Sequence, residues 1–413
     1  MTNYIINRSD TRSSGAAGDV LLTIDDADNL YVAYDGWVIA WGADSTGVRV
    51  TAPAAGQRVD VEGFVRGTAF GIDCLGSGNA IGVYGRVSSD AVGIRLEGGG
   101  NRLTVGPGGI IEGVTDAVQL NAGSTMANAG TILGSIRLEG IGSAFVNTGE
   151  ILSASGPSVL AQGTSMRIVN QGEIVGGLDS PLGNGLNLVN SGRWQGDLRL
   201  TGGGDVVRNA GEIDGDVRLG ESSDLVVNSG LILSNCLLGA GDDRYDGRHG
   251  RISLAVVGDD GADTILGGAD GEDAIGGAGA DFIQGADGHD VINGGKQADR
   301  LLGGSGDDLL LGGSHGDILT GGAGADTMDG GLHKDTFVFR PGFGHDLIQH
   351  FVASGDQADT ILFSRAVFKN FNQLSSNMND VGDDVVIKAG ADTLVLDDVE
   401  KADLDRSDFG FVA

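Results

Sequence analysis

The sequence predicts an all-β protein in which a parallel β-helix is followed by a parallel β-roll and a C-terminal β cap. Glycine supplies 76 of the 413 residues and aromatic residues only 5%, a composition that disfavours long helices because glycine weakens them. The chain also carries two internal repeats, one of 19–23 residues and one of nine. Units this short cannot bury an apolar face alone, so they must stack on their neighbours into a solenoid.

These two repeats divide the chain into four expected segments. They are 1–57, N-terminal strands that cap the solenoid; 58–237, the β-helix; 238–338, the β-roll; and 339–413, the C-terminal cap. The first segment holds Tyr31, Tyr34, Trp37 and Trp41. We interpret these aromatic residues as part of a cover over open strand edges, which otherwise recruit other chains. The alternative is an aromatic contact between subunits.

The longer repeat is marked by a column of asparagines. They stand at Asn128, Asn147, Asn170, Asn190, Asn209 and Asn228. Each follows a short β-branched run and precedes a glycine, a pattern typical of a strand that ends in a turn. We therefore expect a stacked amide ladder at one turn of every coil, with contacts to sugars as the less favoured interpretation.

A second strand in the longer repeat carries an arginine between apolar neighbours. The arginines are Arg95, Arg137, Arg199 and Arg218. Alternation along a strand directs them outward. We expect a solvated face on which they pair with nearby carboxylates such as Glu139, Asp197 and Asp216. The alternative is a contact with an anionic glycan or lipopolysaccharide.

The nine-residue repeat has the form G-G-x-G-x-D-x-U-x, where U is apolar. Well-formed copies begin at Gly276, Gly303 and Gly321. Glycines permit left-handed turn angles and bring carbonyl groups close together. Carboxylate and carbonyl oxygens are the ligands that Ca²⁺ prefers. A column of aspartates at strand spacing would repel itself without a cation.

This repeat resembles that of the RTX (repeat-in-toxin) proteins, whose nonapeptides bind Ca²⁺ in a parallel β-roll. The resemblance implies several Ca²⁺ ions held by turn carbonyls and by the aspartates. The residues are Asp243, Asp263, Asp273, Asp281, Asp290, Asp299, Asp308, Asp317, Asp326 and Asp335. The ions should lie between repeats two apart, for example between Asp281 and Asp299. We expect this region to be largely unfolded without Ca²⁺.

The net charge and the two ends of the sequence limit the partners and the cellular locations that we expect. A net charge of −31 argues against nucleic acid as a partner, and no apolar run approaches the roughly 18 residues of a membrane-spanning helix. The N-terminus has no apolar core typical of a signal peptide. The end of the chain, Asp408 followed by Phe409, Phe411 and Val412, resembles the C-terminal signal of RTX proteins exported by type I secretion machinery. We therefore expect a secreted protein, extracellular or attached to the cell surface.

For function, the sequence favours a Ca²⁺-dependent structural or adhesive protein of the bacterial exterior, similar to surface-layer and matrix proteins and able to self-assemble. The β-helix followed by RTX repeats also resembles the alginate epimerases. However, the Asp-Pro-His motif of those enzymes is absent, and all six histidines lie at His249 or later. We therefore expect no enzyme activity. A carbohydrate-active β-helix enzyme, an epimerase or lyase of uronans, is the alternative, and a non-assembling glycan-binding adhesin is a third possibility.

Overall fold

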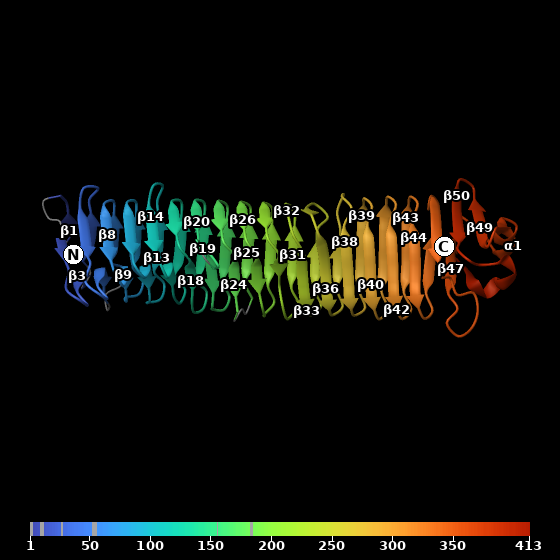
Figure 1. Cartoon of the computed structure of the whole chain (residues 1–413), viewed down its shortest axis with the longest axis horizontal. Coiled ribbons are helices and arrows are strands. Elements are labelled where there is room, and N and C mark those ends of the chain that lie inside the picture. The colour runs from blue at the N-terminus through green and yellow to red at the C-terminus, as the bar shows by residue number, and fades with distance from the viewer. Residues whose placement is uncertain (1–2, 9–11, 26–27, 52–55, 155, 182–184) are drawn as a thin grey trace. The chain divides into compact units, whose positions relative to one another are not determined.

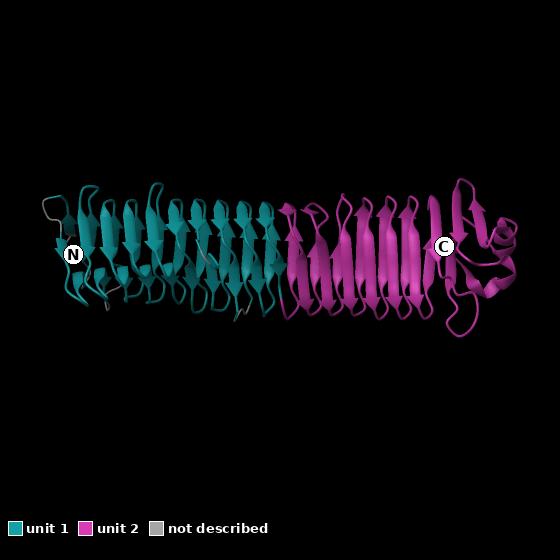
Figure 2. Ribbon diagram, viewed as in Figure 1, with its two compact units in different colours: residues 1–219 teal, residues 220–413 magenta. Residues whose placement is uncertain are grey.

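The computed structural model describes residues 3–8, 12–25, 28–51, 56–154, 156–181 and 185–413. Within them the fold is almost entirely β-sheet, with one short α-helix, α1 (Phe371–Ser375), and two 3₁₀ turns, η1 (Lys401–Asp403) and η2 (Arg406–Asp408). The chain forms two compact units, residues 1–219 and 220–413 (Figures 1 and 2). Each unit is a parallel solenoid. The parallel pairing of their strands confirms the predicted fold class.

Unit 1 is built from coils that each contribute one strand to three parallel sheets. Sheet 1A contains β1 (Asn3–Ile6), β4 (Asn29–Val32), β7 (Arg58–Val61), β10 (Ala80–Val83), β13 (Arg102–Val105), β16 (Thr125–Asn128), β19 (Ala144–Asn147), β22 (Arg167–Asn170), β25 (Asn187–Asn190) and β28 (Val206–Asn209). Sheet 1B contains β2 (Arg12–Ser14), β5 (Trp37–Ala40), β8 (Phe64–Gly67), β11 (Arg86–Ser89), β14 (Ile110–Gly113), β17 (Thr131–Leu133), β20 (Glu150–Leu152), β23 (Glu173–Val175), β26 (Arg193–Gln195) and β29 (Glu212–Asp214). Sheet 1C contains β3 (Val20–Ile24), β6 (Thr46–Val50), β9 (Phe70–Cys74), β12 (Val92–Leu96), β15 (Asp116–Leu120), β18 (Ile136–Leu138), β21 (Val159–Ala161), β24 (Leu178–Ser180), β27 (Leu198–Leu200) and β30 (Val217–Arg218).

The core of unit 1 consists of inward-facing residues that stack from coil to coil. Val65, Val87 and Ile111 are paired in register in sheet 1B and are fully buried. Their sequence neighbours face outward, because successive side chains of a strand point to opposite faces. Alternating apolar and polar residues therefore give each coil one buried and one exposed surface.

The N-terminal segment is not a separate cap, which corrects the expectation for residues 1–57. Strand β1 pairs in parallel with β4, and β4 pairs with β7. Strands β3, β6 and β9 do the same in sheet 1C. The first described residues therefore form two ordinary coils, because Val20–Ile24 and Thr46–Val50 alternate like the later strands. Parts of this segment, at 1–2, 9–11, 26–27 and 52–55, lie outside the described residues.

The predicted amide ladder is present in unit 1. The Nδ2 group of Asn128 donates to Oδ1 of Asn147 at 2.8 Å, and Asn147 donates in the same way to Asn170 at 2.9 Å. The ladder continues through Asn190 to Asn209. These side chains are buried, so the ladder satisfies polar groups inside the turn and does not offer them to a sugar.

Unit 2 begins with coils of three strands and continues with coils of two. Sheet 2A contains β31 (Leu225–Asn228), β34 (Arg244–Asp246), β37 (Thr264–Leu266), β39 (Phe282–Asp287), β41 (Arg300–Ser305), β43 (Ile318–Ala323), β45 (Thr336–Phe339), β47 (Thr360–Ser364) and β51 (Phe409–Val412). Sheet 2B contains β32 (Leu231–Ile232) and β35 (Arg251–Ile252). Sheet 2C contains β33 (Cys236–Ala240), β36 (Ala255–Asp260), β38 (Asp273–Ala278), β40 (Val291–Lys296), β42 (Leu309–Ser314), β44 (Thr327–Leu332), β46 (His345–Gln349), β50 (Asp392–Leu396), β49 (Asp384–Ala389) and β48 (Met378–Val381).

The change from β-helix to β-roll therefore comes later than the expected boundary at 237/238. Strand β35 still pairs with β32, and its inward residue Ile252 is 8% exposed. The nine-residue repeat would place an aspartate at position 252. Ile252 occurs there because residues 251–252 form a strand of the third sheet and not a turn. Two-strand coils of eighteen residues begin at β37.

The C-terminal segment covers the last coils of unit 2. Strands β48, β49 and β50 form an antiparallel meander, while β51 pairs in parallel with β47. Phe339, Phe363 and Phe368 are fully buried beneath them. The apolar tail with export-signal character is thus part of the folded sheet. No helix in the described part of the chain combines the length and hydropathy needed to span a membrane.

Candidate metal centre

Each nonapeptide of unit 2 places one carboxylate in the turn that leads into a strand. We call the carboxylates that precede the strands of sheet 2A the first column: Asp243, Asp263, Asp281, Asp299, Asp317 and Asp335. Those at the start of sheet 2C form the second column: Glu272, Asp290, Asp308, Asp326 and Asp346. The two columns arise because successive nonapeptides lie on opposite sheets.

In each aspartate of the two columns, one carboxylate oxygen accepts a hydrogen bond from the preceding coil, whereas Glu272 accepts from the N–H of Gly268 in its own turn. The backbone N–H of Asp281 donates to Oδ1 of Asp299, and that of Asp299 donates to Oδ1 of Asp317, both at 2.8 Å. The second column repeats the pattern from Glu272 to Asp346, at 2.8–3.1 Å. Aspartates two repeats apart are therefore in direct contact, at the pairs that the sequence analysis expected to share ions.

The second carboxylate oxygen faces a different environment. In the ten aspartates of the two columns Oδ2 is buried and has no hydrogen-bond donor among the residues that the structure describes. They are Asp243, Asp263, Asp281, Asp290, Asp299, Asp308, Asp317, Asp326, Asp335 and Asp346. A buried carboxylate oxygen without a partner is costly, and so many in register call for a positive charge.

The turn glycines and carbonyl groups close around these oxygens. A Cβ atom on Gly276 would lie 2.3 Å from Oδ2 of Asp281 and 2.6 Å from the carbonyl oxygen of Gly294, one coil further. Gly303 stands in the same relation to Asp308 and Gly321. The first glycine of the repeat is thus required because the carboxylate and a neighbouring carbonyl occupy the space of a side chain.

The electrostatics of the columns agree with this geometry. Burial, followed by the charges of neighbouring aspartates, raises the pKa of Asp299 and Asp317 to about 7. The same causes raise the pKa of Asp308 to about 7 and of Asp346 to about 8. Hydrogen bonds from the backbone oppose these shifts only in part. The ionised columns are therefore destabilising on their own and favour a bound cation.

The donor set fits Ca²⁺. Carboxylate Oδ2 atoms and turn carbonyl oxygens are hard ligands, which Ca²⁺ prefers. The first and second columns would hold the ions, which would supply the positive charge that the buried oxygens lack.

Comparison with known proteins agrees with this assignment. A family model for the RTX calcium-binding nonapeptide repeat matches residues 275–310 and 311–348. These residues are RTX repeats. No curated protein matches the chain. The RTX match covers eight of the eleven column members, from Asp281 to Asp346, so the calcium-binding repeats and most of the buried carboxylates are the same segment of the molecule.

The structure corrects one of the predicted ligands. Asp273 is exposed at the start of β38, whereas Glu272 is 5% exposed and occupies the second column. The backbone N–H of Glu272 donates to Asp290 Oδ1 at 2.8 Å. The strict period of nine passes through Glu272, and the expected shift of one residue does not occur. Ala274, not Ile275, then fills the core.

The other nine predicted aspartates lie in the two columns, and Asp346 extends the second column by one coil. The sequence analysis missed Asp346, although Gly342, Gly344 and Asp346 keep the spacing of the repeat. The first column ends differently. Asp359 accepts from the N–H groups of Asp335 and Val352, so both of its oxygens are engaged.

The four predicted arginines lie on the outer face of sheet 1C. Arg95 pairs with the fully buried Asp73 at 2.9 Å and lies 4.1 Å above the ring of Phe70. Arg137 pairs with the equally buried Asp116 at 2.9 Å. Arg199 and Arg218 pair with Asp197 and Asp216. All four guanidinium groups are thus matched by carboxylates, which favours the solvated and self-neutralised face over a site for anionic glycans.

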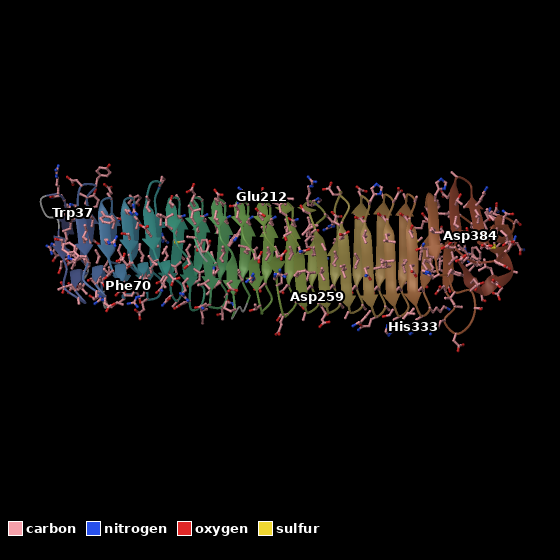
Figure 3. All side chains as sticks on the ribbon, viewed as in Figure 1. Trp37, Phe70, Glu212, Asp259, His333 and Asp384 are labelled. Atoms are coloured by element: carbon pink, nitrogen blue, oxygen red, sulfur yellow. The ribbon has the colours of Figure 1, made fainter. Side chains whose placement is uncertain are left out.

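Gln297, His315 and His333 replace the glycine at position four of their repeats. Their φ angles are +69°, +82° and +82°, so the turn keeps its left-handed conformation at the cost of some strain. The rings of His315 and His333 stack with centroids 5.0 Å apart, on the outside of the turn (Figure 3). Stacking of the two rings offsets part of the backbone strain. We therefore interpret His315 and His333 as tolerated replacements of a turn glycine and not as ligands of a metal.

Proposed function

We propose that this chain is a secreted, Ca²⁺-dependent structural or adhesive protein of the bacterial exterior. The observation that carries the proposal is the pair of columns with unpartnered buried Oδ2 atoms. Without Ca²⁺ these oxygens make folding of the repeats unfavourable, and with Ca²⁺ the ions and the fold form together. Low intracellular and high external Ca²⁺ then keep the repeats unfolded during export and fold them outside.

The C-terminal tail supports export by type I secretion machinery before folding. Phe409 is 6% exposed and its strand β51 is paired with β47, so an exporter reads this segment only in an unfolded chain. A variant truncated after Glu400 is expected to remain inside the cells, while full-length chain reaches the medium. Normal export of the truncated chain would remove this part of the proposal.

Self-assembly into a layer, filament or matrix is supported by the outer faces of the sheets. Each coil repeats the outward positions of the one before it in register, which gives flat surfaces with a regular spacing. Such faces suit lattice contacts between copies of the chain, and the bound Ca²⁺ would reduce the repulsion that a net charge of −31 imposes.

Light scattering on purified chain, before and after addition of millimolar Ca²⁺, tests the proposal, with millimolar Mg²⁺ as the control. Growth into large particles that electron microscopy resolves as sheets or fibres is expected with Ca²⁺ alone. Compaction to a stable monomer would contradict self-assembly and leave the Ca²⁺-folded adhesin. Conversion of uronan polysaccharides at catalytic concentrations would instead establish the alternative, a carbohydrate-active enzyme.

A further inference from the structure

A hollow of about 710 Å³ lies on the outer face of sheet 1B, near the N-terminal end of unit 1. It extends over the outward residues of four consecutive coils, which are paired in register: Trp37, Phe64, Arg86 and Ile110. Tyr34 and Ile39 complete its apolar lining. The hollow belongs neither to the Ca²⁺ columns nor to the arginine face of sheet 1C.

Aromatic rings are exposed in this hollow. The side chain of Tyr34 is 87% exposed and that of Trp37 is 41% exposed, and Trp37 stands among the side chains at the outer surface (Figure 3). Trp37 and Phe64 follow each other on adjacent strands, about 4.8 Å apart. Two rings at this spacing offer a continuous apolar track parallel to the solenoid axis.

One flank of the track is formed by main chain alone. The turns that lead into the strands contribute Gly36, Gly63 and Gly85. A Cβ atom on Gly63 would lie 2.1 Å from the carbonyl oxygen of Gly36, so a side chain is excluded there. An extended ligand can therefore approach peptide groups and aromatic rings at the same time.

The charge of the hollow is negative. Asp35 and Glu62 lie in its lining, and both are exposed. Glu62 is oriented by the hydroxyl of Tyr31, which donates to it at 2.6 Å. Arg86 is the one base among the described lining residues, and it is ion-paired with Glu112. The remaining carboxylates therefore present an excess of negative charge beside the rings.

We propose that this hollow binds a polysaccharide that carries free amino groups. The faces of sugar rings pack on Trp37 and Phe64, and ammonium groups are attracted both by aromatic faces and by the carboxylates of Asp35 and Glu62. A dry protein interface would not keep several charged groups at its centre, and an anionic glycan would be repelled. The inference rests on the adhesive part of the proposed function and names the chemistry of the ligand.

Titration with a glucosamine hexasaccharide, followed by tryptophan fluorescence and calorimetry at physiological salt and millimolar Ca²⁺, tests this assignment. Trp37→Ala is expected to weaken binding about tenfold without any change in net charge. Trp41→Ala is the matched control, because Trp41 is also exposed but lies outside the hollow. The N-acetylated hexasaccharide, which has the same rings without charge, is expected to bind more weakly than the amine.

Equal binding by wild type and Trp37→Ala would overturn the proposal, because it would reduce the effect to attraction between an acidic chain and a cationic sugar. Absence of binding in wild type would also overturn it. Tyr34→Ala serves as a second variant, since this exposed side chain contributes nothing to the core. The outcome is separable from the proposed function, because assembly with Ca²⁺ is measured on the same samples and can succeed where sugar binding fails.

Discussion

The two units fill the same position of their coils with different chemistry. In unit 2 the residue that precedes each sheet 2A strand is an aspartate whose Oδ1 accepts from the preceding coil. In unit 1 the corresponding residues before sheet 1A are neutral from Gln57 to Leu186, while Asp205, before β28, is an aspartate whose Oδ1 accepts from the N–H of Leu186 at 2.6 Å. The N–H of Gln57 donates to Asn79, the N–H of Asn79 to Asn101, and the N–H of Asn101 to Ser124. The hydrogen-bond relay along the coils is therefore common to both units.

The two units differ in the second polar atom of this side chain, which is Nδ2 in an asparagine and Oδ2 in an aspartate. Nδ2 of Asn101 donates to the turn carbonyls of Gly76 and Gly98 at 2.9 and 2.5 Å, whereas Oδ2 of Asp281 or Asp299 has no donor among the described residues. The amide hydrogens of Asn101 thus neutralise two crowded carbonyl groups, whereas in unit 2 the same task is left to a cation. We therefore predict that unit 1 folds by itself and that unit 2 folds with Ca²⁺.

Removal of Ca²⁺ should have the largest effect. A chelator is expected to unfold the two-strand coils of unit 2 while unit 1 keeps its β-structure, because the two columns of buried carboxylates lie in unit 2. Circular dichroism with limited proteolysis and mass spectrometry measures this, and surviving fragments should map to residues before 220. Equal loss of both units, or unchanged β-signal in chelator, would break the comparison.

Replacement of an amide by a carboxylate in unit 1 should have the second largest effect. Asn101→Asp is expected to destabilise unit 1 by about 3 kcal/mol, because it places a buried carboxylate oxygen against two carbonyl oxygens. Denaturant unfolding in chelator measures the change. Asn187→Asp, at a half-buried outward position of sheet 1A, is the control and should cost less. A neutral outcome for Asn101→Asp would show that the amide donors are dispensable.

The pH dependence of the metal-free chain should separate the units further. Burial raises the pKa of Asp299, Asp308 and Asp317 to about 7, whereas an unfolded aspartate titrates near 3.9. Between about pH 4 and 7 the folded state then holds more protons, so unit 2 loses stability as pH rises through this window. Circular dichroism of the metal-free chain at pH 5 and pH 8 checks this, with more β-signal expected at pH 5. More β-signal at pH 8 would contradict the assignment.

The reverse exchange in unit 2 should give a smaller gain. Asp299→Asn is expected to raise the stability of the metal-free repeats by about 1–2 kcal/mol, because Nδ2 can donate to the turn carbonyls as Asn101 does. The same variant should bind fewer Ca²⁺ ions. Calorimetric titration with Ca²⁺ measures the stoichiometry, and circular dichroism in chelator compares the β-signal that the metal-free variant and wild type retain. A smaller β-signal in the variant would show that the coil geometry of unit 2 does not admit the amide.

The smallest effect concerns the corrected ligand. Asp273→Asn should leave the Ca²⁺ stoichiometry and the midpoint of Ca²⁺-induced folding unchanged, because this side chain is exposed. Glu272→Gln, its immediate neighbour with the same change of charge, should lower the stoichiometry or shift the midpoint upward. The reverse ranking of the two variants would restore Asp273 as the ligand.

Much of this architecture could be predicted from the sequence because it is periodic. The spacing of Asn128 and Asn147 predicted the amide ladder, and the spacing of Asp281 and Asp299 predicted which coils touch. The error at Asp273 arose because we looked for an aspartate in every repeat, whereas the residue at this position of the repeat is a glutamate, Glu272. Counting by nine from Asp281 would have found Glu272.

Other features could not be predicted in this way. Gln57, Asn79, Asn101 and Ser124 share one structural role but not one identity, so no repeat signal connects them. The sequence also did not reveal that the third sheet continues to β35, because a strand of two residues is too short to show an alternation of apolar and polar residues. The two N-terminal coils were assigned to a cap because they hold Tyr31, Tyr34, Trp37 and Trp41, which we interpreted as a cover over open strand edges.

The alternation of the two columns limits how this protein can change length during evolution. One coil of the β-roll contains two nonapeptides, and each faces the opposite sheet. A duplication or deletion of eighteen residues adds or removes one whole coil and leaves all later strands on their own sheet. A change of nine residues would move every later strand to the other side, including β51, which would lose its place beside β47. Gene variants of the repeat region should therefore differ by pairs of nonapeptides.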